Sequence, residues 1–335
     1  MRYTALLLCL LLAGCWRSTG SEVVVYTALD SEFSTPILQK FTATSGIAVL
    51  PKFDVESTKT VGLAEAIVAE KDRPRCDVFW NNEILHTLRL KRLGLLEAYQ
   101  PPIAKEYPAA YRDSEGYWHG FAARARVLIV NTQLVRPWNR PTSILDLADL
   151  KWRGRAAMAK PLFGTTATQA ACLFAVWGDG RAKEFFQKVK RNNVQIVAGN
   201  KQVAMAVASG RADFGMTDTD DALIEVEKGM PVEIVYPDQD ADGLGTLFIP
   251  NTLAIIRGAP NPEAARRLVD YLLSPEVEAA LAAGPSAQIP LNPAVETPAR
   301  VKTPQTVHAM KVDFDAAAEK WDVAAKFLRD EFAGG

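Results

Sequence analysis

The chain has 335 residues, a formal net charge of −1, four cysteines and three histidines. Because it lacks the excess of basic residues typical of nucleic-acid-binding proteins, we expect no nucleic-acid partner. The length exceeds what one compact core usually holds, so we expect two lobes.

The first residues, MRYTALLLCLLLAGC, predict an export signal. Their apolar run, residues 5–13, is too short to cross a membrane, which takes about 20 apolar residues. Residues 12–15 resemble the bacterial lipobox, so we expect residues 1–14 to be removed and Cys15 to carry the lipid that anchors the protein to a membrane. An ordinary cleaved signal with an incidental cysteine is the alternative.

Two other cysteines, Cys76 and Cys172, lie far apart in the chain. Their spacing predicts neither a disulfide framework nor a zinc site. We expect two separate buried thiols.

The first half of the chain alternates strands and helices. Residues 22–27 form a β-branched run typical of a strand buried on both faces, a helical pattern covers 34–44, and a second strand, 47–50, follows Gly46, which suits a helix C-cap. Further along we expect a helix over 60–71, a strand over 77–80, a helix over 83–93, a strand over 124–132 and a short helix over 143–150. This order predicts a mainly parallel α/β sheet.

The second half repeats the same alternation. We expect strands over 156–159, 213–217, 231–237 and 246–257, and helices over 167–177, 182–191, 200–210 and, split at Ser274–Pro275, 261–283. The extended segments 125–131 and 246–257 are placed where the chain can pass between lobes, which predicts a hinged clamshell. Ligands of such sheets bind at the carboxyl ends of the strands, so the residues that follow strands are the candidates for a site.

Three stretches that follow strands are rich in oxygen ligands. They contain Asp30, Asn82, Glu83, Asp218, Asp220 and Asp221. Hard cations prefer carboxylate and amide oxygens, and these acids would repel one another without a cation, so the stretches predict a metal site that is more stable when occupied. The alternative is helix capping by Asp30 and by Asp218 or Thr219.

Residues 163–171, FGTTATQAA, predict a second kind of pocket. Gly164, Thr165 and Thr166 precede a helix whose free amide groups attract anions, and the hydroxyl groups add donors. Asn200, at the start of another helix, and Arg124 or Arg126 are further candidates for this anion site. Ordinary capping is the alternative for the Gly-Thr pair.

Several segments occur in an order that resembles the ferric-iron-binding proteins of bacterial ABC importers, in the type II periplasmic-binding-protein superfamily. They are VVVYTALDSEFSTPILQKFTATSGIAV, CDVFWNNEILHTLRLKRLGLLEAY, ARARVLIVNT, SGRADFGMT, NPEAARRLVDYLLSPEVEAAL and AQIPLNP. The resemblance implies a two-lobed α/β clamshell in which each lobe is a mixed, mainly parallel sheet flanked by helices and two hinge segments join the lobes. We expect residues 22–124 and 252–296 in lobe 1, and residues 125–251 and 297–335 in lobe 2.

The family typically holds Fe(III) with a histidine, a glutamate and two adjacent tyrosines, and an anion completes the coordination. By the resemblance, the histidine position falls on Asp30, the glutamate position on Asn82 with Glu83 beside it, and the tyrosine pair on Asp220 and Asp221. None of the usual ligand types is preserved, and the replacements leave an acidic, oxygen-only site.

The family's anion-binding loop matches residues Gly164 to Ala167, with Asn200 as a further match. The resemblance implies a monomeric solute-binding lipoprotein, periplasmic or on the cell surface, that captures Fe(III) or another hard cation and delivers it to an ABC permease. A divalent cation is chemically consistent as well, and the sequence leaves open whether an anion binds together with the metal.

Other ligands fit the same transport role. An anionic or organophosphorus solute would use the Thr165 pocket, with the acids as caps or acceptors. An organic cation such as thiamine would use Trp80, Trp118 or Tyr26 as aromatic walls, although core packing is the more frequent role of such residues.

An exported hydrolase is the alternative from another class. His86, His119 and His308 lack the spacing of metal ligands, and the chain has neither an HExxH nor a GxSxG motif. We therefore expect no enzymatic activity.

Overall fold

The structure, a computed structural model, describes residues 21–54 and 60–332. The predicted export signal and Cys15 lie outside the described residues. The strands are β1 (Glu22–Thr27), β2 (Ala48–Phe53), β3 (Val78–Asn81), β4 (Leu96–Glu97), β5 (His119–Asn131), β6 (Ala156–Ala159), β7 (Gln195–Val197), β8 (Phe214–Asp218), β9 (Val232–Val235) and β10 (Phe248–Ile256). The α-helices are α1 (Ser31–Ser45), α2 (Val61–Ala69), α3 (Leu85–Arg92), α4 (Gly164–Trp177), α5 (Asp179–Arg191), α6 (Asn200–Ala208), α7 (Thr219–Glu227), α8 (Pro262–Leu272), α9 (Pro275–Ala283) and α10 (Phe314–Phe332).

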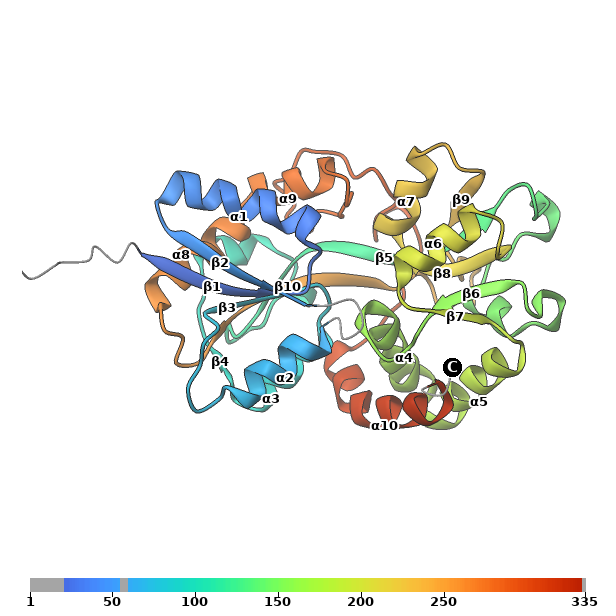
Figure 1. The fold of residues 1–335 in the computed structure, drawn as a ribbon, viewed down its shortest axis with the longest axis horizontal. Helices are drawn as coiled ribbons and strands as arrows, with labels where there is room; N and C mark the ends of the chain where they lie inside the picture. Colours follow the sequence, from blue (N-terminus) through green and yellow to red (C-terminus); the bar gives the residue numbers. More distant parts are fainter. Residues whose placement is uncertain (1–20, 55–59, 333–335) are drawn as a thin grey trace, which may run out of the picture.

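The strands form a mixed sheet in the order β2-β1-β3-β10-β5-β8-β6-β7 (Figure 1). At one end β1 pairs in parallel with β2 and β3, and at the other β6 pairs in parallel with β7 and β8. The long strands β5 and β10 pair antiparallel with their neighbours between these two groups. The expected mixed α/β sheet is confirmed. The expectation that it is mainly parallel was wrong: among the described strands, four pairs are parallel and five are antiparallel, because every pair that includes β5 or β10 is antiparallel.

Strand β5 joins the two halves by changing partners along its length. Its residues up to Ala125 pair with β10, and its residues from Arg126 onward pair with β8 and β9. The crossing point lies between the two parallel groups of strands, where Figure 1 shows β5 and β10 running side by side. The exact limits of the two lobes remain a prediction.

Helices cover both faces of the sheet because successive strand residues point to opposite sides. Val24 and Tyr26 of β1 contribute to one apolar cluster, together with side chains of α2, α3, α4, α5 and α10. Val23 and Val25 contribute to the other, together with side chains of α1, α6, α7, α8 and α9. Figure 1 shows these two sets of helices on opposite faces.

The expected elements are present, with differences at their ends. Helix α4 begins at Gly164, three residues before the expected start, because Gly and Thr are weak helix formers and hide the first turn from a propensity pattern. The expected helix after residue 143 is a 3-10 helix, Ile144–Ala148, whose start is fixed by a capping box between Ser143 and Asp146. Gly46, at φ 71°, ends α1 as expected.

The C-terminal helix α10 crosses between the halves. It packs on α4 and α5, and also on α3.

Cys76 and Cys172 are buried and unpaired, which confirms the expectation for the thiols. Among the described residues, no helix is long and apolar enough to span a membrane.

Candidate ligand-binding site

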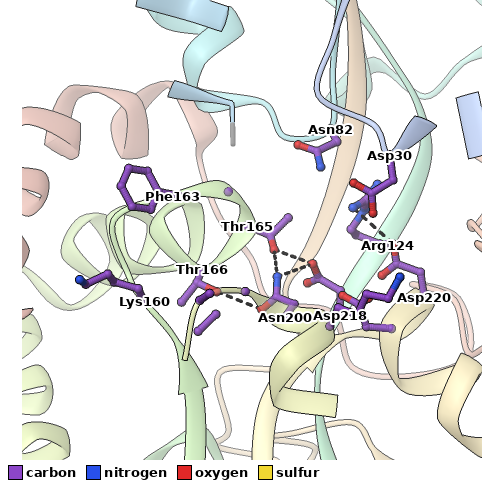
Figure 2. A pocket seen from close by; sticks show the side chains of 16 residues that line it. Asp30, Asn82, Arg124, Lys160, Phe163, Thr165, Thr166, Asn200, Asp218 and Asp220 are labelled. Carbon is purple, nitrogen blue, oxygen red and sulfur yellow. Dashed lines mark hydrogen bonds and ion pairs between the residues drawn. The ribbon is translucent and has the colours of Figure 1, made fainter. Parts of the chain in front are cut away.

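A cavity lies where the two halves of the sheet meet, lined by side chains from both (Figure 2). Asp30 and Asn82 follow β1 and β3 on one side, and Arg124 lies on β5 between the halves. The lining residues of the other half are Ala159, Lys160, Phe163, Gly164, Thr165, Thr166, Ala198, Gly199, Asn200, Lys201, Asp218, Asp220 and Asp221. The cavity therefore sits at the carboxyl ends of the parallel strands, as expected for this class of sheet.

Most residues singled out from the sequence line this cavity. Five of the six candidate metal ligands do so, and the sixth, Glu83, does not. Of the candidate anion ligands, Ala167 and Arg126 are not lining residues. The structure thus brings the candidates together, while their roles as ligands remain a prediction.

Glu83 is fully buried and is hydrogen-bonded within the fold. Its carboxylate accepts hydrogen bonds from the backbone N–H groups of Leu85 and His86, at 2.6 and 3.0 Å, which lie in the first turn of α3. It also accepts from the side chains of Asn81, at 2.7 Å, and of Thr168, at 2.9 Å. Glu83 thus accepts from free N–H groups at the start of α3 and links β3 to α4.

The carboxylate of Asp218 is held by three donors. Arg126 Nη1 donates to its Oδ1 at 2.7 Å, and Thr165 Oγ1 and Asn200 Nδ2 donate to its Oδ2 at 2.6 and 2.9 Å. Arg126 and Asp218 are direct partners in the register of β5 and β8, so their side chains leave the sheet on the same face. The sequence analysis offered Arg126 as an anion ligand, and in the fold its nearest anion is this carboxylate.

Arg124 forms a second buried ion pair, with Asp220 at 3.4 Å from Nη1 to Oδ2. It is 4% exposed, and its Nε and Nη2 atoms have no hydrogen-bond partner. Burial alone would lower the pKa of Arg124, but the negative charges of Asp220, Asp218, Asp30 and Asp221 outweigh this and raise it. Arg124 therefore remains charged and keeps two donors beside the cavity.

The second half also contributes a compact acidic cluster. One carboxylate oxygen from each of Asp218, Asp220 and Asp221 lies within 4.8 Å of the others. The capping alternative fails for Asp218, which precedes α7, and for Asp30, which precedes α1, because neither side chain makes a cap hydrogen bond. Asp220 and Asp221 lie in the first turn of α7, where acids complement the helix dipole.

The charges of the site are mixed. Besides the acids, the cavity is lined by Lys160 and Lys201, and Arg126 lies behind Asp218. The sequence analysis treated the acids as mutually repelling groups, whereas the structure compensates two of them with buried arginines. A ligand therefore meets both charge signs in this cavity.

Comparison with known proteins decides the class of the protein. A model of the family described as "Bacterial extracellular solute-binding protein" matches residues 23–284. The chain belongs to this family of solute-binding proteins.

The relatives of this solute-binding protein extend over most of its length. Iron uptake protein A1 of Synechocystis sp. (strain ATCC 27184 / PCC 6803 / Kazusa) is 27% identical over 300 residues, which cover 85% of this chain and 81% of that protein. The major ferric iron-binding protein of Neisseria meningitidis serogroup A is 25% identical over 309 residues, 90% of each chain. The crystal structure of iron-bound HitA from Pseudomonas aeruginosa superposes with a TM-score of 0.83 at 24% identity, covering 93% of this chain and 99% of that one.

The aromatic residues considered as walls of a site belong to the core of this solute-binding protein. Tyr26, Trp80 and Trp118 are buried, and none of them lines the cavity; Phe163 is the aromatic side chain that does.

The three histidines do not form a catalytic group either. His86 packs edge-on against Trp321, His119 is hydrogen-bonded to the carbonyl oxygen of Tyr99, and His308 is exposed. None of the three histidines lines the cavity. The family, moreover, is one of solute-binding proteins rather than enzymes.

Sequence reasoning missed Lys160, Phe163 and Lys201 as lining residues. Lys160 directly follows β6 and Lys201 lies in the first turn of α6, so the rule that selected the other post-strand residues also covers them. The search for acids and hydroxyls alone left these cations out.

Proposed function

We propose that the protein captures a hard metal cation of the Fe(III) type outside the cytoplasm and delivers it to the permease of an ABC importer. The observation that carries the proposal is the cluster of Asp218, Asp220 and Asp221, whose oxygens lie within 4.8 Å of one another. Asp30 and Asn82 line the same cavity from the other half of the molecule. Oxygen ligands from both sides of a cleft match the preference of hard cations.

The relatives support this ligand class. Two of them are named for iron uptake and for ferric iron binding, and both cover most of this chain. By the resemblance, the positions of the usual histidine, glutamate and tyrosines fall on Asp30, Asn82, Asp220 and Asp221, so the cation would be held by carboxylate and amide oxygens.

Ligand capture would shift the molecule from an open to a closed state. A cation that contacts Asp30 on one side and Asp220 or Asp221 on the other binds the closed state better than the open one. A shift from 1:99 to 99:1 needs a difference of about 5.5 kcal/mol between the two states. The closed shape is then what the permease recognises.

We further propose that lipid at Cys15 keeps the protein at a membrane. The support is the lipobox resemblance of residues 12–15, directly after a short apolar run. Attachment through acyl chains would place the cleft near the permease without a spanning helix.

The cation is identified by analysing protein purified from its own host without chelators. Elemental analysis and native mass spectrometry should find a bound metal. Protein stripped with chelator should melt at a lower temperature than protein reloaded with Fe(III), because a ligand at 100 times its Kd stabilises the folded state by about 2.7 kcal/mol.

Two double variants provide the controls. Asp220→Asn with Asp221→Asn should abolish the difference in melting temperature. Asp240→Asn with Asp242→Asn removes the same charge from exposed acids that do not line the cavity, and should preserve it. An unchanged melting temperature with Fe(III), Ca²⁺, Mg²⁺, Mn²⁺ and Zn²⁺ alike would refute the metal hypothesis.

A solute that carries an oxyanion is the second candidate. Arg124 favours it, because its Nε and Nη2 atoms lie buried at the cavity without hydrogen-bond partners. Charged acceptors such as phosphate or carboxylate bind such donors strongly. The same native mass spectrum separates the candidates, since an organic ligand adds its own mass and no metal.

A further inference from the structure

Three of the side chains predicted to bind an anion already use their donors within the protein. A hydroxyl group has one proton to donate, and an amide group has two. Thr165 donates its proton to Asp218, and Thr166 donates to Asn200 Oδ1 at 3.1 Å. Asn200 Nδ2 contacts Asp218 and Thr165, both at 2.9 Å. These three side chains therefore have no donor left for an anion from solution.

Arg126 completes the same network without lining the cavity. It is fully buried, and its Nη1 contacts Asp218 at 2.7 Å, Asn200 Oδ1 at 3.0 Å and Thr165 Oγ1 at 3.2 Å. Its Nη2 contacts Thr166 Oγ1 at 3.2 Å. A buried guanidinium group needs an anionic partner, and the register of β5 and β8 places Asp218 there permanently.

Asp218 is therefore positioned like a bound anion. It precedes α7 without capping it, and its carboxylate instead faces Thr165 in the first turn of α4 (Figure 2). This end of a helix carries partial positive charge, which favours a negative group.

We propose that the Asp218 carboxylate is a built-in anion that occupies the anion subsite of this cleft. The protein consequently needs no phosphate, carbonate or other anion from solution at this subsite; the free donors of Arg124 lie outside it. This inference rests on the proposed function, since it concerns how the same site completes the surroundings of its ligand. It leaves Asp220 and Asp221 as the acids of this half that contact the cation directly.

The test replaces the built-in anion with one from solution. Formate matches the carboxylate that Asp218→Ala removes, so sodium formate should raise the melting temperature of metal-free Asp218→Ala in a saturable way. Sodium chloride at equal ionic strength should not. Wild type should respond to formate and to phosphate clearly less than Asp218→Ala does, because only the free donors of Arg124 remain for an added anion. The control variant, Asp218→Ala with Arg126→Gln, lacks the cation that would hold formate and should not respond.

Cation binding provides the second readout. With Fe(III) supplied as its nitrilotriacetate complex, formate should change the apparent affinity of wild type by less than about twofold and improve that of Asp218→Ala by about tenfold, a difference of about 1.4 kcal/mol. The effect of formate on the melting temperature of metal-free protein is a separate measurement that does not depend on Fe(III) binding. If wild type binds no Fe(III), the proposed function fails while the thermal measurement still decides the role of Asp218.

The outcomes are distinct. Stabilisation of wild type by formate or phosphate as large as that of Asp218→Ala, or a lack of response in folded Asp218→Ala, would overturn the proposal. If Asp218→Ala does not fold without formate but folds with it, the proposal is supported. If it folds in neither buffer, the wild-type measurement decides, because an open anion subsite in wild type must respond to phosphate.

Discussion

Glu83 and Asp221 both follow a strand, yet their surroundings differ. Glu83 is fully buried, and its carboxylate accepts four hydrogen bonds from two backbone N–H groups and two side chains. Asp221 is partly exposed, lines the cavity and lies in the acidic cluster. The carboxylate of Glu83 therefore serves the start of α3, whereas Asp221 lines the cleft.

Replacing Glu83 should thus affect stability more than ligand binding. Glu83→Gln places an amide group opposite the N–H groups of Leu85 and His86, and a buried donor without an acceptor costs about 1–3 kcal/mol. We expect urea unfolding to show a loss of this size with little change in ligand affinity. Asp221→Asn should show the reverse pattern. Equal effects of the two variants on ligand affinity would contradict a structural role of Glu83 and a binding role of Asp221.

At the scale of elements, α10 packs against α3 through an aromatic contact. The ring of His86 in α3 lies 4.5 Å from that of Trp321 in α10, centroid to centroid, at an interplanar angle of 70°. The imidazole is 1% exposed and neither of its nitrogens has a hydrogen-bond partner. Burial lowers the pKa of His86 below its usual value, and the carboxylate of Glu83 opposes this only in part.

The burial of neutral His86 makes the free energy of unfolding depend on pH in acid. A lowered pKa means that the unfolded chain takes up a proton near pH 6.5 while the folded state does not, so stability is complete above that pH and is lost as the pH falls. The loss approaches about 1.4 kcal/mol per pH unit for one proton. Between pH 7 and pH 5, His86→Phe should lose less unfolding free energy than wild type. The exposed His308→Phe serves as the control and should keep the wild-type slope; equal slopes in all three proteins would refute the role of His86.

At the scale of the whole molecule, the two halves are connected by a small number of segments. Strand β5 pairs with β10 up to Ala125 and with β8 and β9 from Arg126 onward. Arg124 and Arg126 stand on either side of this change of partners and hold Asp220 and Asp218. Rotation about this region would move Asp30 and Asn82 relative to the acids of the other half.

Ligand binding should therefore make the molecule more compact. A ligand shared by both halves stabilises the closed arrangement, so small-angle X-ray scattering should give a smaller radius of gyration for loaded than for stripped protein. Asp220→Asn with Asp221→Asn should remain at the stripped value under the same conditions. A radius that is independent of ligand in wild type would contradict hinge closure.

The sequence by itself predicted most strands and helices in their order, though not β4, β7 or the bounds of α10, because apolar periodicity and turn residues are local signals. It also identified the family and the residues that follow strands, since the carboxyl ends of parallel strands meet at one edge. Asp30, Asn82, Thr165 and Asp220 were therefore found before the fold was known, and the structure places all four around one cavity.

The tertiary structure decided which partner each of these side chains has. Arg126 and Asp218 are 92 residues apart in the chain, and only the register of β5 and β8 brings them together. The enclosure of Glu83 beside α4 depends in the same way on packing between distant elements. The sequence does not show whether a charged residue binds a ligand or another side chain, because its partner is determined by contacts that only the folded chain makes.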